Sequence, residues 1–188
     1  MIGWIIGRVL AKAPGRVIVK SMDIGYEVMV DETALSVDQN VMLWIWHHQT
    51  EKAVTLFGFS SFEARELAIL VAGTDGIGPG TAHKVVTALG YEALVRAVMT
   101  GDTSGLRPVK GVGTKKLTDI LTFLKKSGKV AAAVDPRIGL ALAAIRQLGL
   151  DIEAAEAVLI PLAAQQPDAD VSQLSQQVIV HLARHKAG

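Results

Sequence analysis

The chain has 188 residues, half of them hydrophobic, which is too apolar for a disordered protein and enough for one large domain or two to three small ones. Its 19 Lys and Arg against 18 Asp and Glu give a net charge of +1, which argues against a protein that coats nucleic acid over its whole surface. The lack of cysteine excludes disulfides, thiolate metal sites and a thiol nucleophile.

Charge and aromatic residues are unevenly distributed along the chain. Six of the nine aromatic side chains lie within residues 1–59, which carry a net charge of −1. Residues 60–134 carry +4 and residues 135–188 carry −2, so a basic middle segment lies between two mildly acidic ends. No apolar run reaches the ~18 residues that a membrane span needs, and we expect a cytoplasmic protein with no export signal and no membrane contact.

Residues 1–59 are typical of a small β-barrel. Short β-rich runs alternate with turn signals at 14–15, 23–25 and 38–40, and a polar tip at 47–52 separates the last two runs. Five short strands favour a closed barrel of the oligonucleotide-binding (OB) type, because closure removes exposed sheet edges. The predicted strands are Ile2–Leu10, Arg16–Lys20, Tyr26–Val30, Val41–His47 and Ala53–Phe57.

Residues 60–126 predict a helical domain. The sequence Ser60-Ser61-Phe62-Glu63 forms a capping box before an apolar run that should end near Gly73. Pro79 suits the first turn of the next helix, and Gly90 and Gly101 suit helix ends.

The same segment contains an internal repeat with an offset of 35 residues. Asp75-Gly76-Ile77-Gly78-Pro79-Gly80-Thr81-Ala82 opens one predicted helix, and Lys110-Gly111-Val112-Gly113-Thr114-Lys115-Lys116-Leu117 opens another. Apolar positions coincide after both openings. Two copies indicate a pseudo-symmetric pair rather than a solenoid.

The remaining sequence predicts a linker and a small helical bundle. Residues 127–136 read as a linker, although their Val/Ala run is equally compatible with an extension of the preceding helix. Three helical patterns follow near 137–148, 152–164 and 172–186. We therefore expect an α+β multidomain chain with a barrel at 1–59, a central helical domain at 60–126, a linker at 127–136 and a three-helix bundle at 137–188.

The repeated Gly-hydrophobic-Gly before a helix is typical of a helix-hairpin-helix motif, which grips the nucleic-acid backbone without reading bases. Glycines permit a close backbone approach, and the helix start offers free N–H groups and the positive dipole end to a phosphate. The alternative is a glycine-rich turn that only joins two helices. The expected phosphate-binding residues are Gly76, Gly78, Gly80, Thr81 and Lys84 in the first copy, and Gly111, Gly113, Thr114, Lys115 and Lys116 in the second.

Other chemistry has little support in the sequence. The dinucleotide-binding glycine motif is absent, because Thr81 and Lys116 stand where its third glycine is needed. The glycine motif of P-loop ATPases does not occur in the sequence either. His181 and His185 lie one helical turn apart, but no third metal ligand is evident. The acids Asp23, Asp31, Glu32 and Asp38 suit solvated loops better than a nuclease metal cluster. We expect no catalytic residue, no metal and no cofactor.

The chain resembles the RuvA family, the Holliday-junction-binding subunits of the bacterial branch-migration complex. The resemblance runs through MIGWIIGRVLAKAPGRVIVKSMDIGYEVMV at the start, LFGF at 56–59, GIGPG at 76–80 and GVGTKK at 111–116. It covers the whole chain in order and includes a third small helical module after a linker.

The resemblance implies a non-catalytic subunit for recombination and DNA repair, including the SOS response. Such a protein binds four-way DNA junctions as a homotetramer, or as an octamer on DNA, and holds them open and flat. A UBA-like third domain recruits the hexameric ring ATPase RuvB, with Leu159 and Leu162 as the expected contacts. A RuvC-like resolvase is a further candidate partner. The alternative is a family-derived scaffold that has lost junction selectivity and mainly binds a protein.

Three positions depart from the family pattern. The family carries two adjacent acids in a central pin before LFGF, and here these positions are Glu51 and Lys52. The first hairpin usually has Lys after Gly-x-Gly-Pro, and here that residue is Gly80. The second hairpin usually continues Lys-Lys-Thr-Ala, and here Thr114 precedes the two lysines. These departures predict altered phosphate contacts and a weaker acidic pin.

Overall fold

The computed structural model describes the backbone of residues 1–186, and their side chains except those of 132–134, 136, 164 and 184–186. Packing divides the chain into two compact units, Met1–Leu94 with Ser104–Ile120 and Val95–Thr103 with Leu121–Gly188. This division crosses two helices, and the predicted domain boundaries stay predictions. Within the described part of the chain, none of the helices is both long and apolar enough to cross a bilayer.

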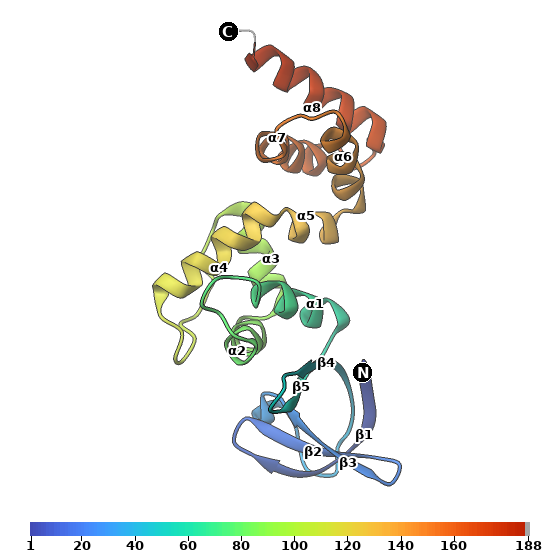
Figure 1. Cartoon of the computed structure of the whole chain (residues 1–188), viewed down its shortest axis with the longest axis vertical. Helices are drawn as coiled ribbons and strands as arrows, with labels where there is room; N and C mark the ends of the chain where they lie inside the picture. Colours follow the sequence, from blue (N-terminus) through green and yellow to red (C-terminus); the bar gives the residue numbers. More distant parts are fainter. Residues whose placement is uncertain (187–188) are drawn as a thin grey trace. The chain divides into compact units, whose positions relative to one another are not determined.

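The first unit begins with a closed five-stranded barrel in the order β1-β2-β3-β5-β4 (Figure 1). β3 and β5 pair in parallel, the other pairs are antiparallel, and β4 closes the barrel on β1. The predicted OB-type barrel is therefore confirmed. The strands are β1 (Trp4–Ala13), β2 (Arg16–Ser21), β3 (Ile24–Met29), β4 (Asn40–Gln49) and β5 (Val54–Phe59).

Alternating side chains fill the inside of the barrel, as the period of a half-buried strand requires. Gly7 lies where β1 passes closest to β2: a Cβ there would stand 2.1 Å from the carbonyl oxygen of Lys20. The close strand contact at this point therefore depends on the missing side chain. The core consists of Ile5, Val9, Val17, Val19, Val28, Val30, Leu43, Ile45 and Leu56.

Two predicted loops of the barrel differ from the structure. The turn expected at 23–25 is a two-residue connection of Met22 and Asp23, because Ile24 and Gly25 already belong to β3. Met22 takes the left-handed conformation (φ 53°), which is uncommon for a residue with a side chain. The tip between the last two strands is shorter than expected, since β4 continues through Gln49 and includes both histidines of the predicted tip.

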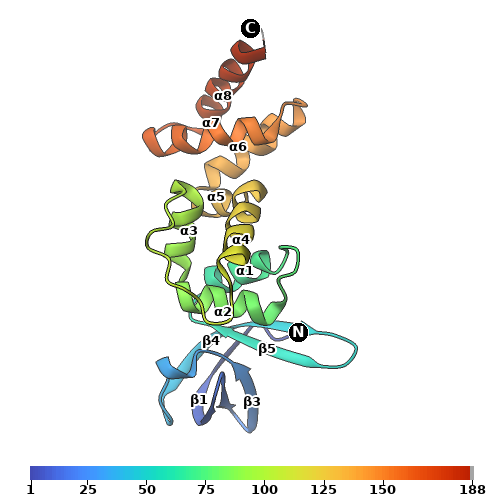
Figure 2. The ribbon, with the colours of Figure 1, turned by 90° about the vertical axis from the view of Figure 1, so that its left-hand side faces the viewer.

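Four helices follow the barrel and include the two repeat openings. Ser61 caps α1 (Phe62–Val71), and its hydroxyl accepts a 3.1 Å hydrogen bond from the Ala64 N–H. The cap lies one residue later than the predicted capping box, which starts at Ser60, so Glu63 is the second helical residue and not the third. α2 (Pro79–Leu89) ends at Gly90, whose φ is +82°. α3 (Tyr91–Thr100) and α4 (Thr114–Ser127) complete the set. Figure 2 shows α1 and α2 beside the β4–β5 side of the barrel.

The predicted linker is partly helical, and the three expected helices after it are present. Gly128 in the left-handed conformation separates α4 from the short α5 (Lys129–Val134). α6 (Pro136–Gln147), α7 (Ile152–Gln165) and α8 (Val171–Lys186) pack on one another around a shared apolar core. The bundle in this unit is thus built as the apolar periodicity predicts.

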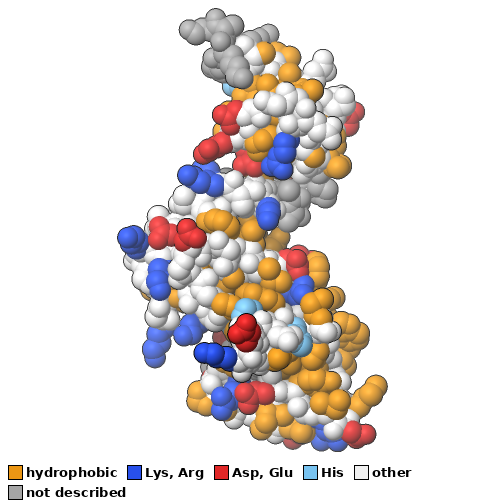
Figure 3. All heavy atoms as spheres, viewed as in Figure 1, with side chains coloured by type: hydrophobic (Ala, Val, Ile, Leu, Met, Phe, Trp, Pro, Cys, Tyr) orange, Lys and Arg blue, Asp and Glu red, His pale blue; other side chains and the backbone are white. Residues whose placement is uncertain are grey.

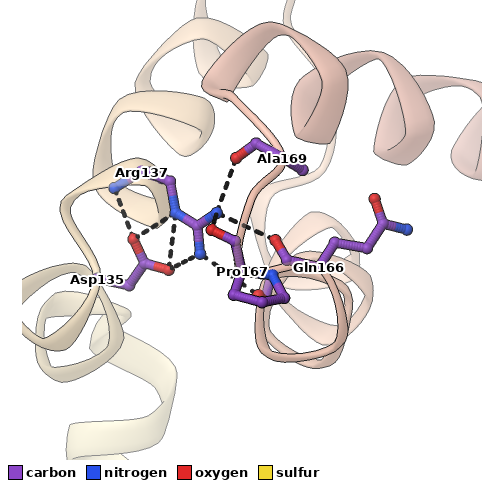
Figure 4. A network of polar contacts seen from close by, with 6 residues as sticks. Asp135, Arg137, Gln166, Pro167 and Ala169 are labelled. Carbon is purple, nitrogen blue, oxygen red and sulfur yellow. Dashed lines mark hydrogen bonds and ion pairs between the residues drawn. The ribbon is translucent and has the colours of Figure 1, made fainter.

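Arg137 holds the three-helix bundle together at the α7–α8 loop (Figure 4). Its guanidinium forms a 2.7 Å ion pair with Asp135. It also donates hydrogen bonds to the carbonyls of Gln166, Pro167 and Ala169 at 3.1, 2.7 and 2.7 Å. One side chain at the start of α6 therefore binds three backbone carbonyls of the loop between α7 and α8. The hydrogen bonds from Arg137 hold the pKa of Asp135 below its ordinary value.

Replacing Gly7 with alanine tests the close contact of β1 and β2. Gly7→Ala should lower the free energy of unfolding by about 1–3 kcal/mol, because the new methyl group meets a backbone oxygen that cannot move independently. Gly3→Ala is the matched control, since nothing lies within 4 Å of the corresponding Cβ position. Denaturant unfolding would measure both changes, and equal stability of the two variants would contradict this account.

Candidate nucleic-acid interface

The first hairpin begins with a tight turn stabilised by a backbone hydrogen bond. The Ile77 N–H donates to the Thr74 carbonyl at 3.0 Å, and Gly76 at the third position has φ +72°. This is the geometry of a type II turn, which favours glycine there. Ile77 is buried, so the turn is anchored in the core while α2 starts two residues later.

The second hairpin repeats this geometry with the same offset of 35 residues. The Val112 N–H donates to the Val109 carbonyl at 2.9 Å, and Gly111 has φ +81°. The buried residue of this turn is Val109, the counterpart of Thr74, whereas Val112, the counterpart of Ile77, is only half-buried. α4 begins at Thr114. The sequence repeat is therefore a structural repeat, and both turns belong to the first compact unit.

Neither the backbone conformation nor packing within the chain requires glycine at the second glycine position of either hairpin. Gly78 has φ −83°, and Gly113 is not among the residues with positive φ. No atom lies within 4 Å of the Cβ position at Gly78, Gly80 or Gly113. A side chain would fit at each position as far as this chain is concerned. The open space in front of the backbone is what close approach of an external group requires.

Each hairpin presents a helix start and exposed positive charge. Gly78 offers no side-chain cap to α2. Pro79 has no N–H and the Thr81 N–H donates to the Gly78 carbonyl at 3.0 Å, so the Gly80 N–H is the group of this first turn that an external acceptor can reach. Lys84 is exposed in the first copy, and Lys115 and Lys116 are exposed in the second. Figure 3 shows Lys and Arg side chains along the left edge of the unit, over the start of α4. With the offset of 35 residues, Lys115 and Lys116 correspond to Gly80 and Thr81 of the first copy. The second hairpin therefore carries more positive charge in the first turn of its helix.

α2 is attached to the barrel through the buried His83, which sequence reasoning missed. His83 is 7% exposed, its Nε2 lies 3.1 Å from the Gly58 carbonyl, and its ring contacts those of Phe57 and Phe59. Burial lowers the pKa of His83, whereas the hydrogen bond to Gly58 and the charge of Asp31 act in the opposite direction. The sequence signal for its burial was the place of His83 between the apolar residues Ala82 and Val85 of the predicted helix.

The β4–β5 tip exposes Glu51 and Lys52 to solvent. Thr50 closes the tip, since its N–H donates to the Ala53 carbonyl at 2.9 Å and its hydroxyl accepts from the Ala53 N–H at 3.1 Å. The two opposite charges therefore stand side by side at the end of the hairpin. Whether this tip acts as a junction pin stays a prediction.

The other candidates do not assemble into a metal site among the described residues. The side chain of His185 lies outside the described residues, so the pair with His181 is not placed. Trp44 packs edge-on against Phe62 of α1, with ring centroids 5.3 Å apart, and Trp46 contacts Phe57 at 5.5 Å. Both tryptophans therefore pack against aromatic neighbours within the chain.

The structure separates the two leucines expected to contact a partner. Leu159 is fully buried in the bundle core, and a buried side chain cannot contact a partner without opening that core. We therefore withdraw Leu159 and keep the half-buried Leu162 as a prediction. Leu148, an apolar residue directly after α6, is 61% exposed, as is Leu140 on that helix. Both leucines are exposed because they lie on the side of α6 that faces solvent. Apolar periodicity alone did not identify that side.

A closed OB-type barrel followed by two equivalent glycine turns, each before a helix, is an architecture typical of DNA-binding proteins. A family model described as the RuvA N terminal domain matches residues 1–58. The chain is 33% identical over 168 residues to the "Holliday junction branch migration complex subunit RuvA" of Amoebophilus asiaticus, which covers 83% of this chain and 87% of that protein. The protein of that name from Bacteroides fragilis is 28% identical over 201 residues, covering 97% of this chain and 100% of that protein. The chain belongs to the RuvA family.

Two glycine variants of the first hairpin separate folding from binding. Gly76→Ala should cost about 1–2 kcal/mol of stability, because alanine is strained at positive φ. Gly78→Ala should cost less than about 1 kcal/mol, the loss typical of a helix cap. It should nevertheless weaken DNA binding at least about tenfold, since the methyl group stands where a phosphate approaches. Denaturant unfolding and fluorescence-anisotropy titration would measure the two effects. Unchanged DNA affinity of Gly78→Ala would contradict the assignment of this interface.

Proposed function

We propose that this chain is the non-catalytic, junction-binding subunit of a DNA branch-migration complex. It binds four-way junctions, holds them in an open planar form and recruits a RuvB-like ring ATPase during recombination and repair. The observation that carries the proposal is the pair of equivalent hairpins whose second glycines face open space. Backbone contacts of this kind bind DNA by its phosphates, which suits a protein that must accept any sequence.

Assembly into a homotetramer is supported by apolar side chains on the outside of the barrel. Trp4 and Ile6 on β1 are 55% and 54% exposed, and Met42 beside Ile6 on β4 is 48% exposed. These side chains neighbour one another on the β1–β4 face, where copies of the chain would bury them. The near-neutral total charge also suits a protein that concentrates positive charge on one side of an assembly.

The exposed face of α6 is the surface that best suits the ATPase. Leu140 and Leu148 lie on the solvent side of that helix, with the exposed Ala144 between them. Two exposed leucines on a small, otherwise well-packed bundle are typical of a protein-binding surface. Leu162 on α7 is an additional candidate. A RuvC-like resolvase would act on the same junction without needing this surface.

The junction preference is tested by a gel shift with a synthetic four-way junction and a duplex of equal length at about 0.15 M salt, where phosphate contacts are already weakened. The junction should bind at least about tenfold more tightly. Equal affinity for both DNAs would favour the alternative, a scaffold that has lost junction selectivity.

Removing both lysines of the second hairpin should weaken binding and its salt dependence together. The double variant Lys115→Ala, Lys116→Ala should reduce the slope of log affinity against log salt concentration by about 2 for each second hairpin that contacts DNA. This is a reduction of about 1 for each lost phosphate contact. The matched control is Lys125→Ala with Lys126→Ala, exposed on the same helix about 15 Å farther along its axis. Equal slopes for both double variants would contradict the hairpin contact.

The α6 surface is tested by a charge substitution on it. Leu148→Asp should abolish ATP-driven branch migration with the cognate ATPase while junction binding stays unchanged, because a carboxylate in an apolar interface is left unpaired. Gln176→Asp adds the same charge at an exposed position of α8 and serves as the control. Leu159→Ala should instead destabilise the bundle by about 2–5 kcal/mol, as a core cavity does. Normal branch migration with Leu148→Asp would contradict this surface.

A further inference from the structure

His83 joins the first hairpin to the barrel close to the start of α2. It follows Gly78 by five residues, so the ring lies about 7.5 Å along the axis from the helix start. A carbonyl oxygen only accepts hydrogen bonds, so the 3.1 Å contact with Gly58 requires a proton on Nε2. Burial of the ring favours its neutral form, which carries that single proton. The ring centroid lies 5.2 Å from that of Phe57 and 5.1 Å from that of Phe59.

This contact connects the two parts of the site that must be held in register. β5, which carries Phe57, Gly58 and Phe59, pairs along its length with β4 and ends the hairpin whose tip is Glu51 and Lys52. α2 carries the Gly80 N–H of the first hairpin in its first turn. The next residue, Lys84, points to solvent while His83 points to the barrel.

We propose that His83 is a positioning residue: its neutral ring fixes α2 on β5 and thereby sets the place of the first hairpin relative to the β4–β5 tip. The role assigned to His83 rests on the proposed function, because register between hairpin and tip matters for a junction more than for a straight duplex. His83 touches no DNA in this arrangement and acts through α2.

Protonation of the ring opposes this arrangement. It places a charge between two phenyl rings at a position with little solvent, and burial accordingly lowers the pKa of His83. The charged group that acts on the ring is Asp31, which favours the protonated form. Because the unfolded chain has the higher pKa, it binds the proton first. Stability is therefore full above about pH 6.5, the unfolded pKa, and falls as the pH decreases towards the folded pKa.

The test compares the full-length wild type with His83→Leu, which keeps apolar packing and cannot titrate. Thermal midpoints without DNA, and the ratio of junction to duplex affinity, are measured from pH 7.5 to 5.5. For the wild type, both should fall on acidification, the ratio by at least about threefold, whereas His83→Leu should stay level in both. His48→Gln, a variant of a histidine in the barrel wall, should follow the wild type. If His83→Leu does not fold, His83→Gln replaces it, because its amide can donate to Gly58 without titrating.

Superimposable pH profiles of the wild type and the His83 variant would overturn the assignment. The assignment would also be overturned if the thermal midpoint of the His83 variant no longer changed with pH while its ratio of junction to duplex affinity still fell like that of the wild type. His83 would then contribute to stability only. A wild type with no junction preference at any pH would contradict the proposed function instead. In that case the DNA-free midpoints alone decide whether His83 titrates at the contact between α2 and β5.

Discussion

The first unit depends on a strand that is buried on both faces. β5 directs Leu56 and Gly58 into the barrel, where a Cβ on Gly58 would stand 2.7 Å from Val28. Its alternate residues, Phe57 and Phe59, point outward and are also buried. Because successive side chains of a strand point to opposite faces, the same five-stranded closure that forms the barrel core also creates a site for α2. The helix that follows the first hairpin of the candidate interface is thus attached directly to the barrel.

The two hairpins of the candidate interface share most of their local structure. Both copies place a positive-φ glycine in a type II turn and a helix start two residues after the turn. The buried apolar residue differs, since it is Ile77 at the end of the first turn and Val109 at the start of the second. The conformational need accounts for Gly76 and Gly111. Gly78 and Gly113 have no such need, and the space before them is open. The two copies differ in charge, since only the second has lysines in its first helical turn.

The second unit is held by polar contacts that periodicity does not reveal. Arg137 pairs with Asp135 and reaches carbonyls about thirty residues away at the end of α7, an arrangement that only the folded chain creates. The same folding decides which leucines are accessible. Leu159 belongs to the core and Leu148 to the surface, although both fit the apolar pattern of the sequence. Helical periodicity predicts an apolar face but leaves the edge of that face uncertain.

The sequence by itself determined the local elements of this protein: alternating apolar residues for five strands, Ser61 and Pro79 at helix starts, and two glycine turns 35 residues apart. These features depend on a residue's own conformational preferences and its near neighbours. Only the tertiary structure decided the turn at Met22, the attachment of α2 through His83, and the contacts of Arg137. Each of these joins residues distant in the chain or overrides a local preference, because packing of the whole unit outweighs the modest cost at one position.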